Sequence, residues 1–259
     1  MRGIDLSGRT GLVLGVANQR SLAWAIAEAL DDAGARLAFT YQGERLEESV
    51  RALASNCQGS LVMPCDVGSD TEMDRVFETL GGEFGRLDFL VHSVAFARRE
   101  DLEGAFSATS REGWRTALEI SAYSLVSLAD RASSMMKPED GASILTLTYL
   151  GSQRVFPNYN VMGSAKAALE HAVRQLAYEL GEKNIRVNAI SAGPVSTLSA
   201  RGISGFTQMI GHACERAPLR RNIEAREVAD AALFLLSPLA SGITGTTLYV
   251  DAGYHIMGT

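Results

Sequence analysis

The stretch TGLVLGVANQRSLAWAIAEAL, residues 10–30, decides the fold class that we expect for this chain. The apolar run 10–16 predicts a strand, and helical spacing over 21–33 follows it after a short turn. Dinucleotide-binding folds hold phosphates at such a turn, where backbone amides and the helix dipole face the anion. The turn departs from G-x-G-x-x-G, because only Gly15 remains before Ser21. A purely structural turn is therefore the alternative interpretation.

The rest of the chain repeats this alternation. Further strands are predicted at 36–41, 60–67, 87–94, 142–149, 186–193 and 246–253, and further helices at 44–55, 70–84, 110–136, 159–182 and 225–236. The strands are continuous apolar runs, which is typical of a parallel sheet buried on both faces. We therefore expect an α/β fold, a Rossmann-like, doubly wound, seven-stranded parallel sheet with helices on both faces, in one domain over 1–259.

Two segments, 95–109 and 195–223, fit neither pattern well. Both follow predicted strands, so they should lie at the carboxyl edge of the sheet, where open α/β sheets bind ligands.

Composition excludes several classes of protein. The chain has 259 residues with a net charge of −6, which argues against a nucleic-acid-binding face. No apolar run approaches the roughly 18 residues of a membrane span, and the N-terminus lacks the apolar stretch of a signal peptide. The three cysteines form no CxxC pair and no metal-ligand spacing, so we expect no metal and a reduced, cytoplasmic location.

Two further strand ends support a nucleotide site. Asp66 ends the third predicted strand, where it could accept from an adenine amino group or simply cap the next helix. Gln42 ends the second, where dinucleotide folds often place a ribose-binding acid, or an arginine for a 2′-phosphate. Because Gln42 is neutral, we expect NADH rather than NADPH. The fourth strand ends in HSVAFA, 92–97, whose small residues let a flat cofactor approach the backbone.

The segment YLGSQRVFPNYNVMGSAK, 149–166, is the candidate for chemistry. Tyr149 ends the fifth strand, at the same edge as the nucleotide. Tyr159 begins the long helix and shares a face with Lys166, seven residues on, but the two are roughly 10.5 Å apart along the axis. Lys166 is therefore better placed to hold a cofactor ribose than to bond the phenol directly. The alternative is that both tyrosines only pack and that Lys166 is a solvated surface charge.

Several motifs together resemble one family over nearly the whole chain. They are GVANQRSLAWAIA, AFTYQ, CDV, VHSVAFA, EISAYS, TLTYLG, PNYNVMGSAKAALE, IRVNAISAGPVSTL and GITGTTLYVDAGY. They resemble the NADH-dependent enoyl-acyl-carrier-protein reductases, divergent short-chain dehydrogenase/reductases of bacterial fatty-acid synthesis. The Tyr-x6-Lys spacing is specific to this type, since ordinary members of the superfamily use Tyr-x3-Lys preceded by a serine. Tyr149 stands in that serine's place, and Ser121 stands where a helix asparagine is usual.

The resemblance implies roles for individual residues. Tyr149 and Tyr159 would lie over an enoyl thioester carried by acyl-carrier protein, with Ala97, Ile203 and Phe206 also contacting substrate, and Lys166 would bind the nicotinamide ribose. The segment 197–215 would be a mobile substrate-binding flap, and the protein a homotetramer. The remaining cofactor-binding residues would be Gly15, Ser21, Leu22, Gln42, Asp66, Val67, Val94, Val195, Ser196, Thr197, Leu198 and Ser199.

The chain also departs from the family pattern. Ala95 replaces a common glycine and Ser196 a frequent arginine, while Ser204, Thr207 and Gln208 stand where relatives carry basic residues for docking the carrier. The chemistry that we expect is hydride delivery to the β-carbon, with Tyr159 donating to the thioester oxygen as charge develops there. The alternatives are a carbonyl reductase on the same fold and a catalytically silent NAD-binding regulator.

Overall fold

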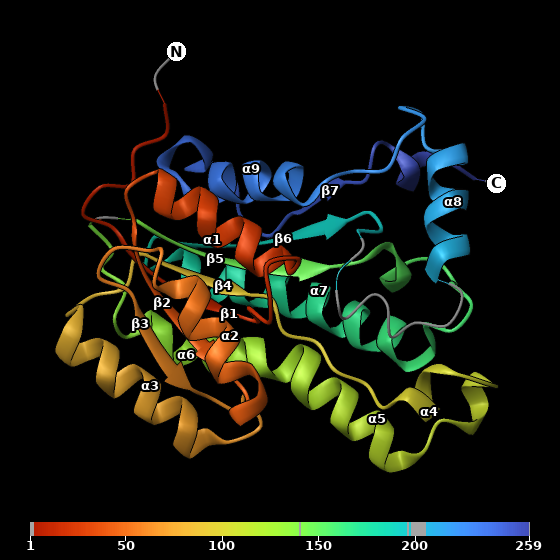
Figure 1. The fold of residues 1–259 in the computed structure, drawn as a ribbon, viewed down its shortest axis with the longest axis horizontal. Coiled ribbons are helices and arrows are strands. Elements are labelled where there is room, and N and C mark those ends of the chain that lie inside the picture. The colour runs from red at the N-terminus through yellow and green to blue at the C-terminus, as the bar shows by residue number, and fades with distance from the viewer. Residues whose placement is uncertain (1–2, 140, 196, 198–205, 259) are drawn as a thin grey trace.

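The computed structural model describes residues 3–139, 141–195, 197 and 206–258, and their centre is a seven-stranded parallel sheet. The strand order is β3-β2-β1-β4-β5-β6-β7, and every neighbouring pair is parallel. This confirms the predicted sheet (Figure 1). The strands are β1 (Thr10–Leu14), β2 (Arg36–Tyr41), β3 (Leu61–Pro64), β4 (Phe89–His92), β5 (Ala142–Thr148), β6 (Ile185–Ala192) and β7 (Thr247–Val250).

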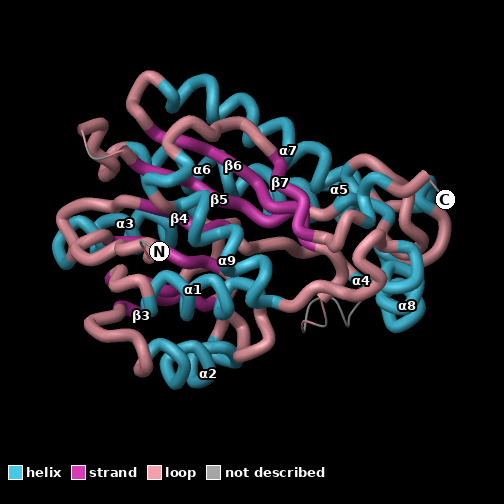
Figure 2. Tube along the Cα trace, turned by 90° about the horizontal axis from the view of Figure 1, so that it is seen from above, coloured by secondary structure: helices cyan, strands magenta, loops and turns pink. Residues whose placement is uncertain are grey.

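Helices cover both faces of the sheet (Figures 1 and 2). One core cluster packs α1, α2 and α9 against one face, and a second packs α3, α6 and α7 against the other. The side chains of adjacent strand residues pack in opposite clusters: Val13 lies in the first cluster, and Leu12 and Leu14 lie in the second. The helices are α1 (Leu22–Asp32), α2 (Glu44–Ala54), α3 (Asp70–Glu83), α4 (Arg99–Leu102), α5 (Arg111–Leu118), α6 (Ser124–Ser133), α7 (Asn160–Gly181), α8 (Phe206–Arg216) and α9 (Ala225–Leu236).

Short turns of other helix types connect these elements. They are η1 (Phe106–Ala108), the π-helical turn η2 (Glu119–Tyr123), η3 (Leu150–Ser152), η5 (Pro238–Ala240) and η6 (Tyr254–Ile256).

The predicted helix 110–136 is wrong in one respect, because the π-helical turn η2 separates α5 from α6. Buried Ser121 lies in this turn, and its hydroxyl accepts from the Phe96 amide at 3.0 Å and donates to the Phe96 carbonyl at 3.1 Å. The turn therefore fixes the loop after β4. The Ser69 hydroxyl caps α3 by accepting from the Glu72 amide at 3.4 Å.

The two segments that fitted no pattern carry helices of their own. Residues 95–109 contain α4 and η1, and 195–223 contain α8. The helices α4 and α8 lie at the same end of the molecule (Figures 1 and 2), beyond the strands that precede them. Within the described residues, no helix is long and apolar enough to cross a membrane.

Candidate active site

The two tyrosines of the candidate site meet where β5 ends and α7 begins. Their ring centroids are 5.1 Å apart and the rings are edge-on, with an interplanar angle of 65°. Tyr159 is the N-cap of α7 and is buried, in a small cluster with Met162 and Ala165 against which Tyr149 and Ala97 pack. The structure thus brings together Tyr149, Tyr159 and Ala97, three residues that the sequence assigned to the substrate.

Two glycines make this close fit possible. A Cβ at Gly151 would lie 2.6 Å from the Tyr159 ring and 3.1 Å from the Tyr149 ring. On α7, a Cβ at Gly163 would lie 2.8 Å from the carbonyl oxygen of Gly151. Side chains at these positions would push the η3 turn, and the Tyr149 that precedes it, away from the helix.

Both phenols stay protonated at neutral pH. Burial is the main cause that raises the pKa of Tyr159, and the neighbouring Tyr149 and Glu170 act in the same direction. Burial also raises the pKa of Tyr149, followed by the effects of Tyr254 and Asp251. The Tyr149 hydroxyl donates to the sulfur of Met209 on α8 at 3.2 Å. Thioether sulfur is a weak acceptor, so a substrate oxygen can replace it.

Lys166 is buried, with 6% of its surface exposed, and the expectation of a surface-facing lysine is wrong. Its Nζ donates to the carbonyl oxygen of Leu147 on β5 at 2.8 Å, and the described residues show no bond from it to either phenol. The lack of a bond between Lys166 and Tyr159 agrees with the seven-residue spacing between them. Burial lowers the pKa of Lys166 to about 8, and the negative charge of Glu170 opposes this change. The ammonium group is thus a costly buried cation that a ligand can help to satisfy.

His92, at the end of β4, lies fully buried in the same region. Its Nε2 is 2.8 Å from the Ser124 hydroxyl, and its Nδ1 is 2.8 Å from the Thr146 hydroxyl. Ser124 donates its own proton to Ile120 O at 2.6 Å, whereas the other acceptor near the Thr146 hydroxyl, His92 O, lies further away at 3.2 Å. We therefore assign the proton of the neutral ring to Nε2, with Thr146 donating to Nδ1. Burial, and then the charge of Lys166, lower the pKa of His92 to about 3.

The β1–α1 turn has the features of an anion cradle. Gly15 has φ +94°, and a Cβ there would lie 2.0 Å from Ser93 O, so only glycine fits. Ser21 is the N-cap of α1, yet its hydroxyl donates back to Asn18 O at 2.6 Å and does not cap the helix. The first amides of α1 are thereby left for a ligand such as a pyrophosphate.

Gln42 and Asp66 lie together at the ends of β2 and β3. Gln42 Nε2 donates to Asp66 Oδ2 at 3.0 Å, and the other oxygen of Asp66 accepts from the Gly68 amide at 2.8 Å. Gln42 is exposed and Asp66 partly exposed. Ser69 rather than Asp66 caps the next helix, so the purely structural interpretation of Asp66 loses its main support.

The other predicted ligand residues vary in burial. Val67 is buried, and Leu22, Val94 and Val195 are half-buried against the cores. The amide of Thr197 donates to Val195 O at 2.7 Å. Ser196, Leu198, Ser199 and Ile203 lie outside the described residues, and of Phe206 only the backbone, at the start of α8, is described. Of the predicted flap 197–215, the described part is therefore Thr197 and most of α8.

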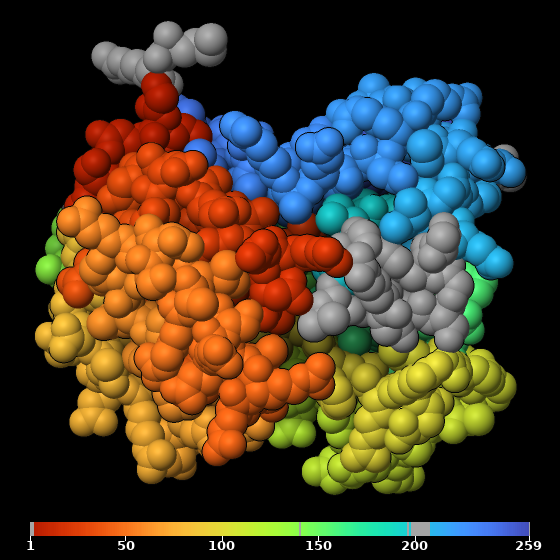
Figure 3. All heavy atoms as spheres, viewed as in Figure 1, coloured from red at the N-terminus to blue at the C-terminus, as the bar shows by residue number. Residues whose placement is uncertain are grey.

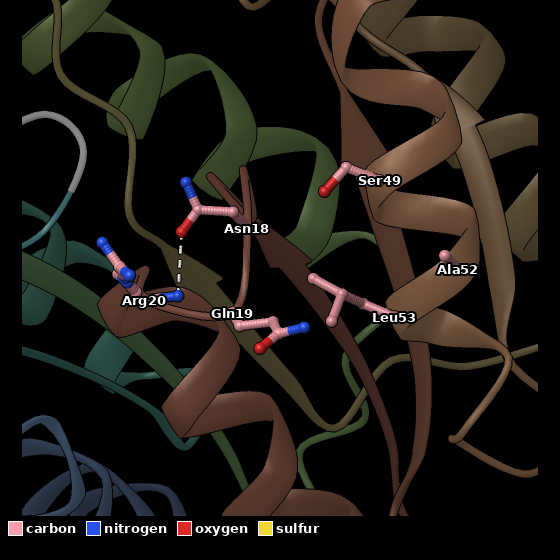
Figure 4. A pocket seen from close by; sticks show the side chains of 6 residues that line it. All are labelled: Asn18, Gln19, Arg20, Ser49, Ala52 and Leu53. Atoms are coloured by element: carbon pink, nitrogen blue, oxygen red, sulfur yellow. Dashed lines mark hydrogen bonds between the residues drawn. The ribbon is translucent and has the colours of Figure 1, made fainter.

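A pocket of about 360 Å³ opens between the β1–α1 turn and α2. The Ser49 hydroxyl on α2 donates to Ala17 O at 3.1 Å, and the Arg20 amide donates to Asn18 Oδ1 at 2.8 Å. The first bond ties the turn to α2, and the second lies within the turn. The residues that line the pocket (Figure 4), none of them predicted from the sequence, are Asn18, Gln19, Arg20, Ser49, Ala52 and Leu53.

Sequence reasoning missed three residues that shape the site: Gly151, His92 and Glu170. Gly151 was quoted within a motif without a role, although a glycine directly between a strand-end tyrosine and a helix is a signal of close approach. Glu170 follows Lys166 by four residues in KAALE, so the two share a helix face. Nothing in the local sequence separates His92 from an ordinary core residue.

The fold and this sheet edge define a Rossmann-class dinucleotide-binding protein with a tyrosine–lysine site. The family model described as enoyl-(acyl carrier protein) reductase matches residues 15–255. The enoyl-[acyl-carrier-protein] reductase [NADH] FabI of Bacillus cereus is 54% identical over 255 residues, which cover 98% of this chain and 99% of that protein. The chain therefore belongs to the enoyl-(acyl carrier protein) reductase family.

Solved structures agree with this assignment. A crystal structure of the Bacillus cereus enoyl-acyl carrier protein reductase with NADP+ and indole naphthyridinone has a TM-score of 0.96 and 53% identity, covering 99% of this chain and 100% of that one. The enoyl-(acyl-carrier-protein) reductase of Anaplasma phagocytophilum in complex with NAD has a TM-score of 0.93 and 45% identity, covering 100% of this chain and 96% of that one.

Proposed function

We propose that this protein reduces the trans-2 double bond of enoyl thioesters on acyl-carrier protein, with NADH, during fatty-acid elongation. Family membership supports the class of reaction. The observation that carries the proposal is the edge-on pair of Tyr149 and Tyr159. The family resemblance implies that Tyr149 takes the place of the serine in the serine–tyrosine pair of carbonyl reductases. A bulky ring at the end of β5 suits an elongated conjugated substrate.

A nicotinamide held at this site would supply the hydride that the β-carbon of the substrate accepts. Charge then develops on the thioester oxygen, two carbons away, and Tyr159 donates a hydrogen bond to it. The raised pKa of this buried phenol keeps its proton available at neutral pH. A single preorganised donor in a dry site contributes roughly 3 kcal/mol to transition-state stabilisation.

The residues present fit a dinucleotide along the sheet edge. The Gly15 cradle and the uncapped first turn of α1 suit a pyrophosphate. Gln42 and Asp66 offer polar groups to the adenosine. Lys166 would hold the nicotinamide ribose, because its buried ammonium group has the Leu147 carbonyl as its hydrogen-bond acceptor and is left with further protons to donate.

The direct test supplies NADH with a trans-2-enoyl thioester in one vessel and a 3-ketoacyl thioester in another, each on carrier protein and on coenzyme A. We expect NADH absorbance to fall only with the enoyl substrates. Turnover of the keto substrate would point to a carbonyl reductase, and no turnover with either to a non-catalytic NAD-binding protein. Comparing carrier with coenzyme A tests whether Ser204, Thr207 and Gln208 still permit carrier docking.

The described part of the predicted flap supports a substrate-closing role. Met209 of α8 accepts from the Tyr149 hydroxyl at 3.2 Å, and His212 lies edge-on to Tyr254 with centroids 6.2 Å apart. The space-filling view places α8 near the α4–α5 segment at one end of the molecule (Figure 3). We propose that α8 shifts when an acyl chain enters beside Tyr149.

Exposed apolar side chains on α5, η2, α6 and α7 support the homotetramer. Tyr178 is 86% exposed and Tyr123 58%, while Trp114 and Val126 are exposed as well. Aromatic and aliphatic surface of this kind commonly marks an interface between subunits. Sedimentation velocity should give a mass four times the 27.7 kDa of one chain. We also place the protein in the cytoplasm, in keeping with its free cysteines.

A further inference from the structure

Glu170 carries a buried carboxylate beside the turn that holds Tyr149. It lies one turn beyond Lys166 on α7 and is 5% exposed. Its Oε1 accepts from the Thr148 hydroxyl at 2.8 Å and the Ser152 hydroxyl at 2.6 Å, and its Oε2 accepts from Gln153 Nε2 at 3.4 Å. A buried carboxylate is costly unless it is paired and hydrogen-bonded. This one has three donors and a buried cation on the same helix face.

Those donors flank the residues that set the tyrosine geometry. Thr148 directly precedes Tyr149, and Ser152 directly follows Gly151. Glu170 therefore ties both sides of the η3 turn to α7. The turn has little freedom to move, because Gly151 is already in close contact with both tyrosine rings. The position of the Tyr149 ring against Tyr159 thus depends on Glu170 through the residues on either side of the turn.

Glu170 follows Lys166 by four residues on α7, so the two buried side chains lie on the same face of the helix. Burial opposes the ammonium form of Lys166, and Glu170 is the negative charge that favours it. His92, from β4, is neutral. The two phenols, from the end of β5 and the start of α7, are also neutral. Asp101 of α4 is also buried: its Oδ1 accepts from the amide and the hydroxyl of Ser110 at 3.2 and 3.3 Å, while its Oδ2 has no hydrogen-bond partner among the described residues. The remaining charged groups on the elements packed against α7 have other partners or are exposed; they are Glu119 of η2, Arg111, Glu112 and Arg115 of α5, Asp130 and Arg131 of α6, Arg99 and Glu100 of α4, and Arg186 of β6.

We propose that Glu170 is a positioning residue of the reductase, which rests on the function proposed above. Its carboxylate fixes the Tyr149 turn to the helix that carries Lys166, and its negative charge holds Lys166 in the ammonium form that binds the nicotinamide ribose. Gln153 extends this network, since its Nε2 also lies 2.6 Å from the Tyr249 hydroxyl.

The test compares Glu170→Gln with Glu179→Gln, which makes the same change at an exposed position on the same helix. Glutamine keeps an acceptor for the Thr148 and Ser152 hydroxyls but removes the charge. NADH affinity is measured by nicotinamide fluorescence across the range in which Lys166 titrates. In the wild type, affinity should fall as the pH rises through about 8. In Glu170→Gln this fall should move toward lower pH by about one pH unit, and in Glu179→Gln it should stay in place.

Two results would overturn the proposal: an unchanged profile in Glu170→Gln, or an equal loss of affinity at every pH, as expected for general damage to the fold. Glu170→Asp keeps the charge with a shorter reach. Glu170→Asp should show the wild-type pH profile of NADH affinity, but its enoyl turnover should be reduced. This variant keeps the proposal testable if Glu170→Gln does not fold. Wild-type enoyl turnover is measured in parallel. Its absence would refute the proposed function, whereas its presence with a failed pH shift refutes only the role of Glu170.

Discussion

The two ends of the proposed cofactor site are built differently. At the tyrosine–lysine end, Tyr159, Lys166 and Glu170 are all buried, and Lys166 and Glu170 have close hydrogen-bond partners in the protein. At the adenosine end, Gln42 is exposed and its side chain donates to the partly exposed Asp66 at 3.0 Å. Hydrogen bonds and charges act more strongly where water is excluded. The buried end is therefore where a single group can change the reaction rate or the stability, and the open end is where changes should be mild.

The largest effect should follow the loss of the Tyr159 hydroxyl. In Tyr159→Phe the ring still packs but donates nothing to the developing oxyanion, so kcat/KM for the enoyl thioester should fall by ~100-fold or more. Steady-state kinetics measure this. Tyr178→Phe is the control and should retain wild-type kinetics, because it removes a hydroxyl from the same helix outside the site and keeps the ring that the proposed subunit interface uses. A loss in kcat/KM of less than about threefold in Tyr159→Phe would show that the phenol takes no part in the chemistry. The contrast between the buried and the open end of the site would then not hold.

The second effect concerns stability and pH at the buried end. The pKa of His92 is about 3 in the folded protein, against 6.5 as its ordinary value. Between these values the unfolded chain binds more protons than the folded one, so stability is lost as the pH falls. From about pH 7 to about pH 5 the loss from this group should be about 2 kcal/mol.

Urea unfolding of His92→Gln at both pH values checks this. The variant starts from a lower stability, but its loss on acidification should be smaller than that of the wild type by that amount. His171→Gln, on the exposed surface of α7, should lose as much as the wild type. An equal loss in His92→Gln would assign the acid sensitivity to other groups.

A third, smaller effect tests the packing of the tyrosine pair. In Gly151→Ala the new methyl group meets both rings and must displace at least one, so kcat/KM should fall by about tenfold through misalignment. Gly181→Ala, at the end of α7, meets nothing within 4 Å and serves as the matched control. Unchanged kinetics in Gly151→Ala would show that the pair tolerates movement, contrary to the rigid end described above.

The same contrast separates what the sequence could predict from what it could not. All seven strands and the long helix predicted over 159–182 depend on local apolar pattern, and the structure confirms them, with Tyr159 as the N-cap of α7. The alternative interpretation of Lys166 as a solvated surface charge is wrong. Its burial depends on a carbonyl of β5, which no local pattern along α7 reveals.

The break between α5 and α6 is another tertiary effect. The sequence 110–136 contains no proline, and its one glycine, Gly113, lies within α5. The π-helical turn is instead accompanied by the bonds between Ser121 and Phe96, a contact across 25 residues. Such turns often occur at functional sites, and this one fixes the loop beside Ala97. Helix α4 was missed because four residues are too few to show a helical period.

The smallest effect should come from the open end, through the choice between NADH and NADPH. Gln42 carries no charge, and Glu44 begins α2 two residues later, where it repels a 2′-phosphate. NADH should therefore give the higher kcat/KM. An exposed ion pair contributes at most ~1 kcal/mol, so Gln42→Arg should raise the NADPH to NADH ratio of kcat/KM by only about fivefold. Gln58→Arg adds the same charge in the exposed turn before β3, at the amino edge of the sheet, and should leave the ratio unchanged.

Raising the ionic strength should reduce the effect of Gln42→Arg, because dissolved ions screen exposed charges. A clear NADPH preference in the wild type would refute the assignment of Gln42. A change of 100-fold or more in Gln42→Arg, insensitive to salt, would mean that this end of the site is as dry as the other, and the comparison would fail.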